Sequence, residues 1–176
     1  MTALPFRTGI AYDVHRFDSA RPLVLGGVTI PGGPGLAGHS DADALTHAAA
    51  DAILGAIALR DIGRHFPPGD PACANIDSRR ILAFAVEQAG GLGYEVANLD
   101  VMIIAETPKL APWIDPMRTS LARTMGLTPD RIGIKATTNE GLGSIGRGEG
   151  IAALASVLLA SRTSEEPTGG SRPGRR

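Results

Sequence analysis

The stretch 43-DALTHAAADAILGAIAL-59 decides the fold of this chain. Its apolar side chains recur at Leu45, Ala49, Ala52, Ile53, Ala56 and Ile57. Spacings of three and four residues place these side chains along one side of an α-helix. The stretch therefore predicts a helix over 43–59 with one buried side.

The segments around this helix predict strands and further helices. Residues 9–17 alternate as a strand, with Ile10, Tyr12 and Val14 on one face and Asp13 and His15 on the other. The other expected elements are a hairpin at 23–30, a helix from the Asp77/Ser78 cap to Gly90, a strand at 95–105 buried on both faces, a helix at 112–125 closed by Gly126, a strand at 132–136 and, with a helix as the alternative, a strand at 151–159. Strands separated by full-length helices favour an α/β or α+β layered fold.

The composition of the 176 residues excludes several classes of protein. The 17 basic and 18 acidic residues give a net charge of −1, whereas proteins that bind a nucleic-acid polymer usually carry a basic face. The single Cys73 excludes a disulfide framework and a cysteine-based zinc site. No apolar run reaches the ~18 residues of a membrane span, and residues 1–7 lack the apolar centre of a signal peptide. We expect a cytoplasmic protein that contacts no nucleic-acid polymer and no membrane.

The chain changes character near its end. Residues 162–176 contain four arginines, two glutamates and otherwise Ser, Thr, Pro and Gly, with nothing to bury. This composition predicts a disordered C-terminal tail over 162–176, either a solvated extension or an arm that binds a partner. Residues 1–161 are expected to form a single domain.

Two short polar clusters contain candidate metal ligands. Alternation along a strand places Asp13 and His15 on one face, about 7 Å apart along the backbone, which suits either a surface pair or two ligands of one metal ion. His39, Asp43, His47 and Asp51 recur every four residues, so the last three share a side of the predicted helix. His39 would lie just before this helix, near its positive end, where phosphate also binds. Asp13, His15 and His47 together would make the three-ligand set of a catalytic zinc site, although spacing alone does not show that the two segments meet.

The segment 135-KATTNEGLGSIGRGEG-150 follows the strand predicted at 132–136. Hydroxyls and glycines after a strand supply O–H and N–H donors that can surround a phosphate. Glu140 suits a hard cation such as Mg²⁺ or Mn²⁺ that bridges phosphate oxygens. The alternative is an ordinary glycine-rich turn with an exposed glutamate. The P-loop pattern G-x-x-x-x-G-K-[ST] is absent.

Six segments in order resemble the 2-C-methyl-D-erythritol 2,4-cyclodiphosphate synthase family. They are D-V-H at 13–15, H-S-D-A-D-x-x-x-H from His39, D-I-G-x-x-F-P from Asp61, A-E-T-P-K-L from Ala105, K-A-T-T-N-E from Lys135 and G-R-G-E-G-I from Gly146. The resemblance implies an α/β homotrimer whose single-domain subunits have a mixed four-stranded sheet with helices packed on one side and whose active sites lie between adjacent subunits. It implies a phosphorus–oxygen lyase of non-mevalonate isoprenoid synthesis that cyclises 4-diphosphocytidyl-2-C-methyl-D-erythritol 2-phosphate and releases CMP.

The resemblance also assigns roles to residues of this sequence. Asp13, His15 and His47 would bind Zn²⁺, Glu140 would bind Mg²⁺ or Mn²⁺, and His39 and Thr138 would stabilise the transition state. Substrate would further contact Ser40 as well as Asp13, His15 and His39. The methylerythritol and phosphate part would contact Asp61, Ile62, Gly63, Phe66, Pro67, Pro68, Gly69 and Asp70. The cytidine end would contact Ala105, Glu106, Thr107, Pro108, Lys109, Leu110, Ala111, Thr137, Thr138, Asn139 and Glu140, and Ser144 and Arg147 complete the expected set.

Three departures from the family pattern qualify these roles. Pro68 and Gly69 replace more polar residues, so contacts there would come from the backbone, and Asn139 stands where threonine is common. Ser144 stands where many members have phenylalanine, beside an axial cavity that holds isoprenoid diphosphates in relatives, which puts such binding in doubt. Two other readings stay open at this point: a non-catalytic diphosphate-binding trimer, and a zinc hydrolase that uses Glu140 or Asp43 as its base.

Overall fold

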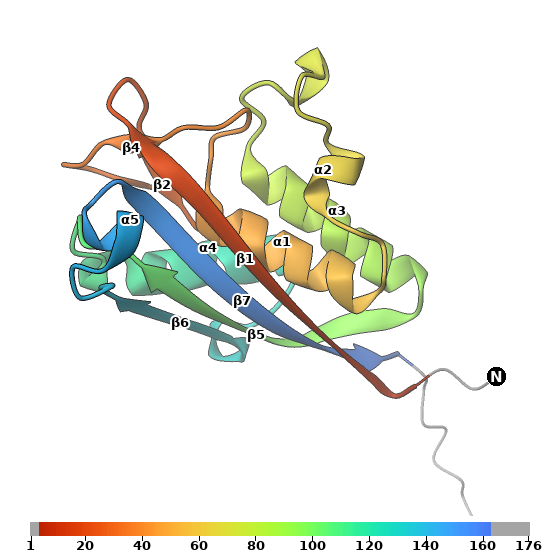
Figure 1. The fold of residues 1–176 in the computed structure, drawn as a ribbon. Helices are drawn as coiled ribbons and strands as arrows, with labels where there is room; N and C mark the ends of the chain where they lie inside the picture. Colours follow the sequence, from red (N-terminus) through yellow and green to blue (C-terminus); the bar gives the residue numbers. More distant parts are fainter. Residues whose placement is uncertain (1–3, 163–176) are drawn as a thin grey trace, which may run out of the picture.

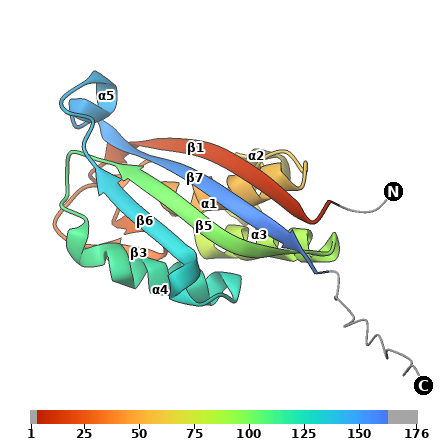
Figure 2. The same cartoon turned by 90° about the horizontal axis from the view of Figure 1, so that it is seen from below.

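A computed structural model describes residues 4–162, which form one sheet covered by helices on one face. The strands lie in the order β4-β1-β7-β5-β6, and all neighbours are antiparallel except the parallel pair β5 and β6. Helices α1, α3 and α4 pack on the same face, and β1 and β7 cross the molecule as long neighbouring strands (Figures 1 and 2). The α/β layered architecture predicted from the sequence is confirmed. Within the described residues no helix is long and apolar enough to cross a membrane.

The sheet has five strands, so the expected count of four is wrong. The strands are β1 (Phe6–Asp18), β4 (Gly35–Leu36), β5 (Tyr94–Ile104), β6 (Ile132–Thr137) and β7 (Gly150–Ser161), with the hairpin β2 (Leu23–Leu25) and β3 (Val28–Ile30) beside them. The extra strand β4 is two residues long and pairs with Phe17 and Asp18 at the end of β1. Alternation cannot be recognised over two residues. The hairpin at 23–30 and the strand at 151–159 are both confirmed.

The three long helices begin and end close to the expected residues. They are α1 (Ala44–Ala56), α3 (Ser78–Gly91) and α4 (Ile114–Met125). The one-turn helices α2 (Ile62–His65) and α5 (Gly143–Gly146) and the 3₁₀ turns η1 (Pro71–Cys73), η2 (Ala111–Trp113) and η3 (Pro129–Arg131) were not predicted. Asp77 caps α3 by accepting the N–H of Arg79. Gly126 ends α4 at φ 67°, a left-handed conformation that suits glycine.

The helix α1 lies unusually close to the sheet. A side chain added at Gly9 of β1 would place its Cβ only 1.9 Å from the carbonyl oxygen of Ala52. Glycine within a strand often marks this kind of backbone approach. The residues of β7 that face α1 include the buried Ala153 and Ala155. Small side chains on both layers therefore allow α1 to pack against β1 and β7.

The other face of the sheet is open and apolar. Ile10 is 70% exposed, Tyr12 57% and Leu154 39%. Met102 and Ile104 of β5 are only half-buried, so the expectation that residues 95–105 are buried on both faces is wrong for the single chain. The predicted alternation in β1 is right, but its large apolar side chains lie on the face away from the helices. A face of this kind marks a contact surface.

Arg162 belongs to the described part of the chain. Its N–H donates to the carbonyl of Gly93 at 2.7 Å. The remaining residues of the tail predicted at 162–176 lie outside the described residues.

Candidate metal centre and substrate cavities

Asp13, His15 and His47 converge from two elements. Asp13 and His15 occupy alternate positions of β1 on the face covered by α1, and His47 lies in the first turn of α1. Asp13 Oδ2 lies 3.0 Å from His15 Nε2 and 3.1 Å from His47 Nδ1, and the two nitrogens are 3.2 Å apart. Two ligands of a tetrahedral ion at 2.0–2.1 Å lie about 3.3–3.4 Å apart. The three residues can therefore hold one metal ion.

The second nitrogen of each histidine has its own partner. His15 Nδ1 lies 2.6 Å from the carbonyl oxygen of Ala37, and His47 Nε2 lies 2.9 Å from Ser78 Oγ and 3.0 Å from Ser40 Oγ. Metal-binding histidines usually make such an outer hydrogen bond, which orients the ring. Two imidazole nitrogens and one carboxylate, each oriented in this way, fit a zinc-type ion.

Hydrogen bonds within this group shift the pKa values of Asp13 and His15. Burial opposes ionisation of Asp13, but hydrogen bonds with His15 and His47 outweigh burial and hold the pKa of the carboxyl well below its usual range. Burial also opposes protonation of His15, but the hydrogen bond to Asp13 outweighs it and raises the pKa of that imidazole. Asp13 is therefore ionised at neutral pH and available as a ligand.

Asp43 and Asp51 do not join the metal group. Asp43 is fully buried and accepts four hydrogen bonds, from the N–H groups of Gly26, Gly27 and Thr46 and from the Thr46 hydroxyl. Asp51 accepts the N–H of Ile62 at 2.6 Å, where α2 begins. A carboxylate enclosed by donors has no access to a water molecule, so Asp43 is not the base of a hydrolase. The three residues that recur every four positions therefore have different roles. Asp43 caps α1, Asp51 accepts a hydrogen bond from the start of α2, and His47 is the candidate metal ligand.

A cavity of about 200 Å³ lies beside the metal group. His39 lines it from the loop before α1, and its side chain is exposed, whereas the neighbouring Ser40 is buried and bonded to His47. The predicted residues that line this cavity are Asp13, His15, His39, Ser40, His47, Ile62, Gly63, Phe66 and Pro68. Asp61, Pro67, Gly69 and Asp70 lie beside it in the chain without lining it; Asp61 caps α2 and Asp70 caps η1. Sequence reasoning missed Gly38, Cys73, Ile76 and Ile81, because nothing in their spacing links them to a site.

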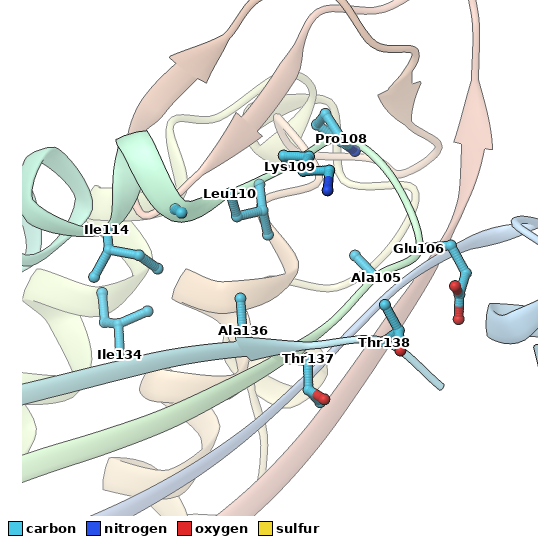
Figure 3. Close-up of a pocket in the computed structure, with 11 residues that line it drawn as sticks. Ala105, Glu106, Pro108, Lys109, Leu110, Ile114, Ile134, Ala136, Thr137 and Thr138 are labelled. Carbon is cyan, nitrogen blue, oxygen red and sulfur yellow. The ribbon is translucent and has the colours of Figure 1, made fainter. Parts of the chain in front are cut away.

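A second cavity of about 370 Å³ opens between the end of β6 and the start of α4 (Figure 3). Of the predicted residues it contains Ala105, Glu106, Pro108, Lys109, Leu110, Ala111, Thr137 and Thr138, and it also contains Ile114, Ile134 and Ala136, which were not predicted. Thr107 does not line it. Glu106 accepts the backbone N–H of Asn139 at 2.8 Å and so joins the loop after β5 to the loop after β6. The two cavities share no lining residue.

The glycine-rich loop after β6 is exposed along most of its length. Thr138 Oγ1 donates to Glu140 Oε1 at 3.2 Å, and Glu140 has a positive φ of 51°. Ser144 lies in α5, and Arg147 pairs with Glu149 at 2.7 Å. Asn139, Glu140, Ser144 and Arg147 were predicted to contact substrate, but they line neither of the two cavities described above. Their side chains are exposed on the subunit.

Fold and site together define a single-domain α/β protein with a candidate three-ligand metal centre and two cavities next to loops that follow strands. The chain matches the YgbB family over residues 6–160. It belongs to that family, and the relatives most similar to it include 2-C-methyl-D-erythritol 2,4-cyclodiphosphate synthases.

Individual relatives cover nearly the whole described chain. The synthase of Laribacter hongkongensis is 55% identical over 159 residues, which are 90% of this chain and 98% of the relative. A solved structure of a 2C-methyl-D-erythritol-2,4-cyclodiphosphate synthase in its CDP-bound form has a TM-score of 0.80 at 38% identity and covers 87% of this chain and 99% of its own. The bifunctional IspDF from Campylobacter jejuni has a TM-score of 0.86 at 43% identity and covers 90% of this chain, which spans 43% of that longer protein.

Proposed function

We propose that this protein is an enzyme that converts 4-diphosphocytidyl-2-C-methyl-D-erythritol 2-phosphate to 2-C-methyl-D-erythritol 2,4-cyclodiphosphate and CMP, in isoprenoid biosynthesis. The convergence of Asp13, His15 and His47 at mutual distances of 3.0–3.2 Å, in a chain of this family, carries the proposal. A member that had become a binding protein would be free to lose a ligand, and none is lost.

The reaction needs positioning more than proton transfer. An oxygen of the 2-phosphate attacks the β-phosphorus, a new P–O bond closes the ring, and the bond from the β-phosphorus to the bridging oxygen breaks, so that CMP leaves with that oxygen. The attacking phosphate is already an anion at neutral pH, so no general base is required. The barrier comes from bringing two anionic groups together, and positioning and charge neutralisation lower it.

Metal ions would supply most of the positive charge. Asp13, His15 and His47 would hold Zn²⁺, and Glu140 would hold Mg²⁺ or Mn²⁺ against the diphosphate. Bound ions polarise phosphoryl oxygens and neutralise charge that develops in the transition state. His39 at the mouth of the metal cavity and Thr138 at the other cavity are suitably placed as additional donors.

Substrate would bind across both cavities. The cavity beside the metal group would take the methylerythritol and phosphate part, with contacts from Asp61 to Gly63 and Phe66 to Asp70. The cavity of about 370 Å³ between β6 and α4 would take the cytosine, with contacts from Ala105 to Ala111 and from Thr137 to Glu140.

The active form would be a homotrimer with each active site between adjacent subunits. The exposed Ile10, Tyr12 and Leu154 supply an apolar contact face. In one subunit the metal cavity and the cytosine cavity are separate, so a neighbouring subunit would have to bring the two kinds of cavity together. We further infer that the catalytic domain spans 1–161 and that the protein is cytoplasmic.

The test compares His47→Ala with the matched control His65→Ala. His65 bonds to the carbonyl oxygen of Leu59 at 2.9 Å, outside the metal group. Chromatography measures CMP release, and ³¹P NMR distinguishes the cyclic diphosphate from the open phosphate that a hydrolase would give. We expect His47→Ala to abolish CMP release while light scattering shows an unchanged assembly, and His65→Ala to retain activity. Undiminished turnover in His47→Ala would contradict the zinc assignment, and an open product would contradict cyclisation.

The role of Glu140 is tested separately, by metal titration. Glu140→Ala is expected to raise the Mg²⁺ or Mn²⁺ concentration needed for half-maximal CMP release at least tenfold. The control is Glu95→Ala, an exposed glutamate of β5, which should leave the titration unchanged. An unchanged titration in Glu140→Ala would remove Glu140 from the metal site.

A further inference from the structure

The ring of His47 is bonded at both nitrogens. Its Nδ1 faces Asp13 and His15, whereas its Nε2 faces two hydroxyl groups, Ser78 Oγ at 2.9 Å and Ser40 Oγ at 3.0 Å. The residue is only 5% exposed. A neutral imidazole carries its proton on one nitrogen, so the direction of these hydrogen bonds decides which nitrogen has a free lone pair.

Ser78 fixes that direction through Asp41. Ser78 is the first residue of α3 and is fully buried. Its Oγ donates to Asp41 Oδ1 in a short hydrogen bond, and its backbone N–H donates to Asp41 Oδ2 at 3.1 Å. A carboxylate only accepts, so the single hydroxyl proton of Ser78 points to Asp41. The lone pairs of Ser78 Oγ therefore face His47 and accept the proton of Nε2.

The resulting chain runs from His47 through Ser78 to Asp41. The ionised Asp13 competes for the ring proton from the other side, because its Oδ2 lies 3.1 Å from Nδ1. With the proton held on Nε2 by Ser78, the lone pair of Nδ1 points to the place where the Asp13 and His15 ligand atoms meet. A neutral serine between the ring and the carboxylate keeps the negative charge of Asp41 away from the metal group while still orienting the ring. This arrangement differs from that of His15, whose outer partner is a backbone carbonyl.

Asp41 is itself held by backbone contacts. Its N–H donates to the carbonyl of Ile76 at 3.0 Å, and the N–H of Asn75 donates to the carbonyl of His39 at 2.7 Å. The loop before α1 and the turn before α3 therefore lie side by side, so the acceptor for Ser78 is fixed independently of the metal group.

We propose that Ser78, oriented by Asp41, is a positioning residue that sets the tautomer of His47 for metal binding. The metal-binding part of this inference stands on the hydrogen bonds alone, and its consequence for catalysis rests on the proposed function. Outer hydrogen bonds of this kind typically change metal affinity by 10–100-fold. Since Ser40 Oγ still contacts Nε2 at 3.0 Å in Ser78→Ala, we expect a loss of about tenfold, at the low end of that range.

The experiment uses the purified protein with Zn²⁺ alone, in competition with a chromogenic chelator. Ser78→Ala is compared with Ser120→Ala, a partly buried serine of α4 whose Oγ has no hydrogen-bond partner, and with Asp77→Ala, which removes the cap of α3 without touching His47. Ser78→Ala should bind Zn²⁺ about tenfold more weakly, and both controls should bind as the unchanged protein does. An unchanged affinity in Ser78→Ala, or an equal loss in Asp77→Ala, would overturn the proposal.

A spectroscopic measurement separates positioning from general destabilisation. In Zn²⁺-loaded protein labelled with ¹⁵N-histidine, long-range ¹H–¹⁵N correlation should show the proton of His47 on Nε2, and Ser78→Ala should shift this Nε2–H resonance and speed the exchange of its proton with water. Asp41→Asn, which weakens the acceptor without deleting a contact to His47, should move both readouts in the same direction by a smaller amount and serves if Ser78→Ala does not fold. A His47 Nε2–H resonance that has the same position and exchange rate in all variants would refute the inference.

These measurements contain no substrate, so they are independent of the proposed reaction. Failure of the unchanged protein to release CMP would refute the proposed function and leave the affinities standing. Equal zinc affinities in an enzyme that does release CMP would refute the role of Ser78 and leave the function standing.

Discussion

Replacing Asp43 by alanine should destabilise the protein far more than the loss of an ordinary helix cap. The carboxylate is fully buried and accepts N–H groups from Gly26 at 2.9 Å, Gly27 at 2.6 Å and Thr46 at 3.0 Å, together with the Thr46 hydroxyl at 2.7 Å. A buried donor left without a partner costs about 1–3 kcal/mol. The Thr46 hydroxyl can rotate and water can enter the space, so we expect a net loss of about 3–5 kcal/mol rather than the full sum.

The isosteric variant Asp43→Asn tests whether the number of accepted bonds sets this loss. One oxygen remains to accept from Gly26 and Thr46, while the new amide group faces the N–H of Gly27, so about 2 kcal/mol should be lost. The measurement is denaturant unfolding of the metal-free protein at one fixed concentration, followed by circular dichroism. For a chain of this length the alanine variant should melt about 10 °C lower.

The comparison variant is Asp77→Ala, because Asp77 accepts the N–H of Arg79 at a partly exposed cap. That change should cost about 1 kcal/mol. If Asp43→Ala lost no more free energy of unfolding than Asp77→Ala, the buried carboxylate would not be what holds the β2–β3 hairpin to the start of α1, and the reasoning would be wrong.

Three further changes probe the sheet and the helix α3. Gly9→Ala should lower the free energy of unfolding by about 3 kcal/mol, because the new Cβ would lie 1.9 Å from a carbonyl oxygen of α1. The control Gly55→Ala lies on the exposed side of α1, where a new Cβ has nothing within 4 Å, and should raise the melting temperature slightly. Leu154→Glu should dissociate the proposed homotrimer in light scattering, since it puts a charge into the apolar open face, whereas Leu92→Glu at the end of α3 should not. An intact homotrimer in Leu154→Glu would place the contact surface elsewhere. A hydrogen bond from its arginine partner lowers the pKa of Asp77 below 3.8, so the stabilisation by this carboxylate is present at neutral pH and is lost as the pH falls below about 4. The difference in stability between the unchanged protein and Asp77→Ala should accordingly shrink in acid, and a constant difference would contradict this.

Much of the fold follows from the sequence because its long elements have strong periodicity. The helix predicted at 43–59 is α1, and the strand at 151–159 is β7. The strand β4 could not be predicted, because its two residues are paired only through the end of β1. Which face of β1 the helices cover was also beyond the sequence, since alternation separates two faces without saying where the helix lies.

The candidate site was predicted less completely than the fold. Asp13, His15 and His47 were singled out by residue type and spacing, and the structure places their ligand atoms together. Ser78 was noticed only as part of a helix start, because its contacts with His47 and Asp41 join segments more than thirty residues apart. Hydrogen bonds between residues far apart in the chain produce no periodic pattern in a single sequence.

The geometry of the metal group depends on residues that carry no chemistry. Shifting β1 by one residue against β7 would exchange its two faces. Tyr12 and Val14 would then point at α1, where the approach at Gly9 leaves no room for a side chain, and Asp13 and His15 would point away from His47. The close packing of α1 on β1 therefore excludes the shifted register, and the correct register is what aims both β1 ligands at the helix. The glycine and alanine residues beneath α1 are therefore as necessary for the geometry of the metal centre as the ligands themselves are.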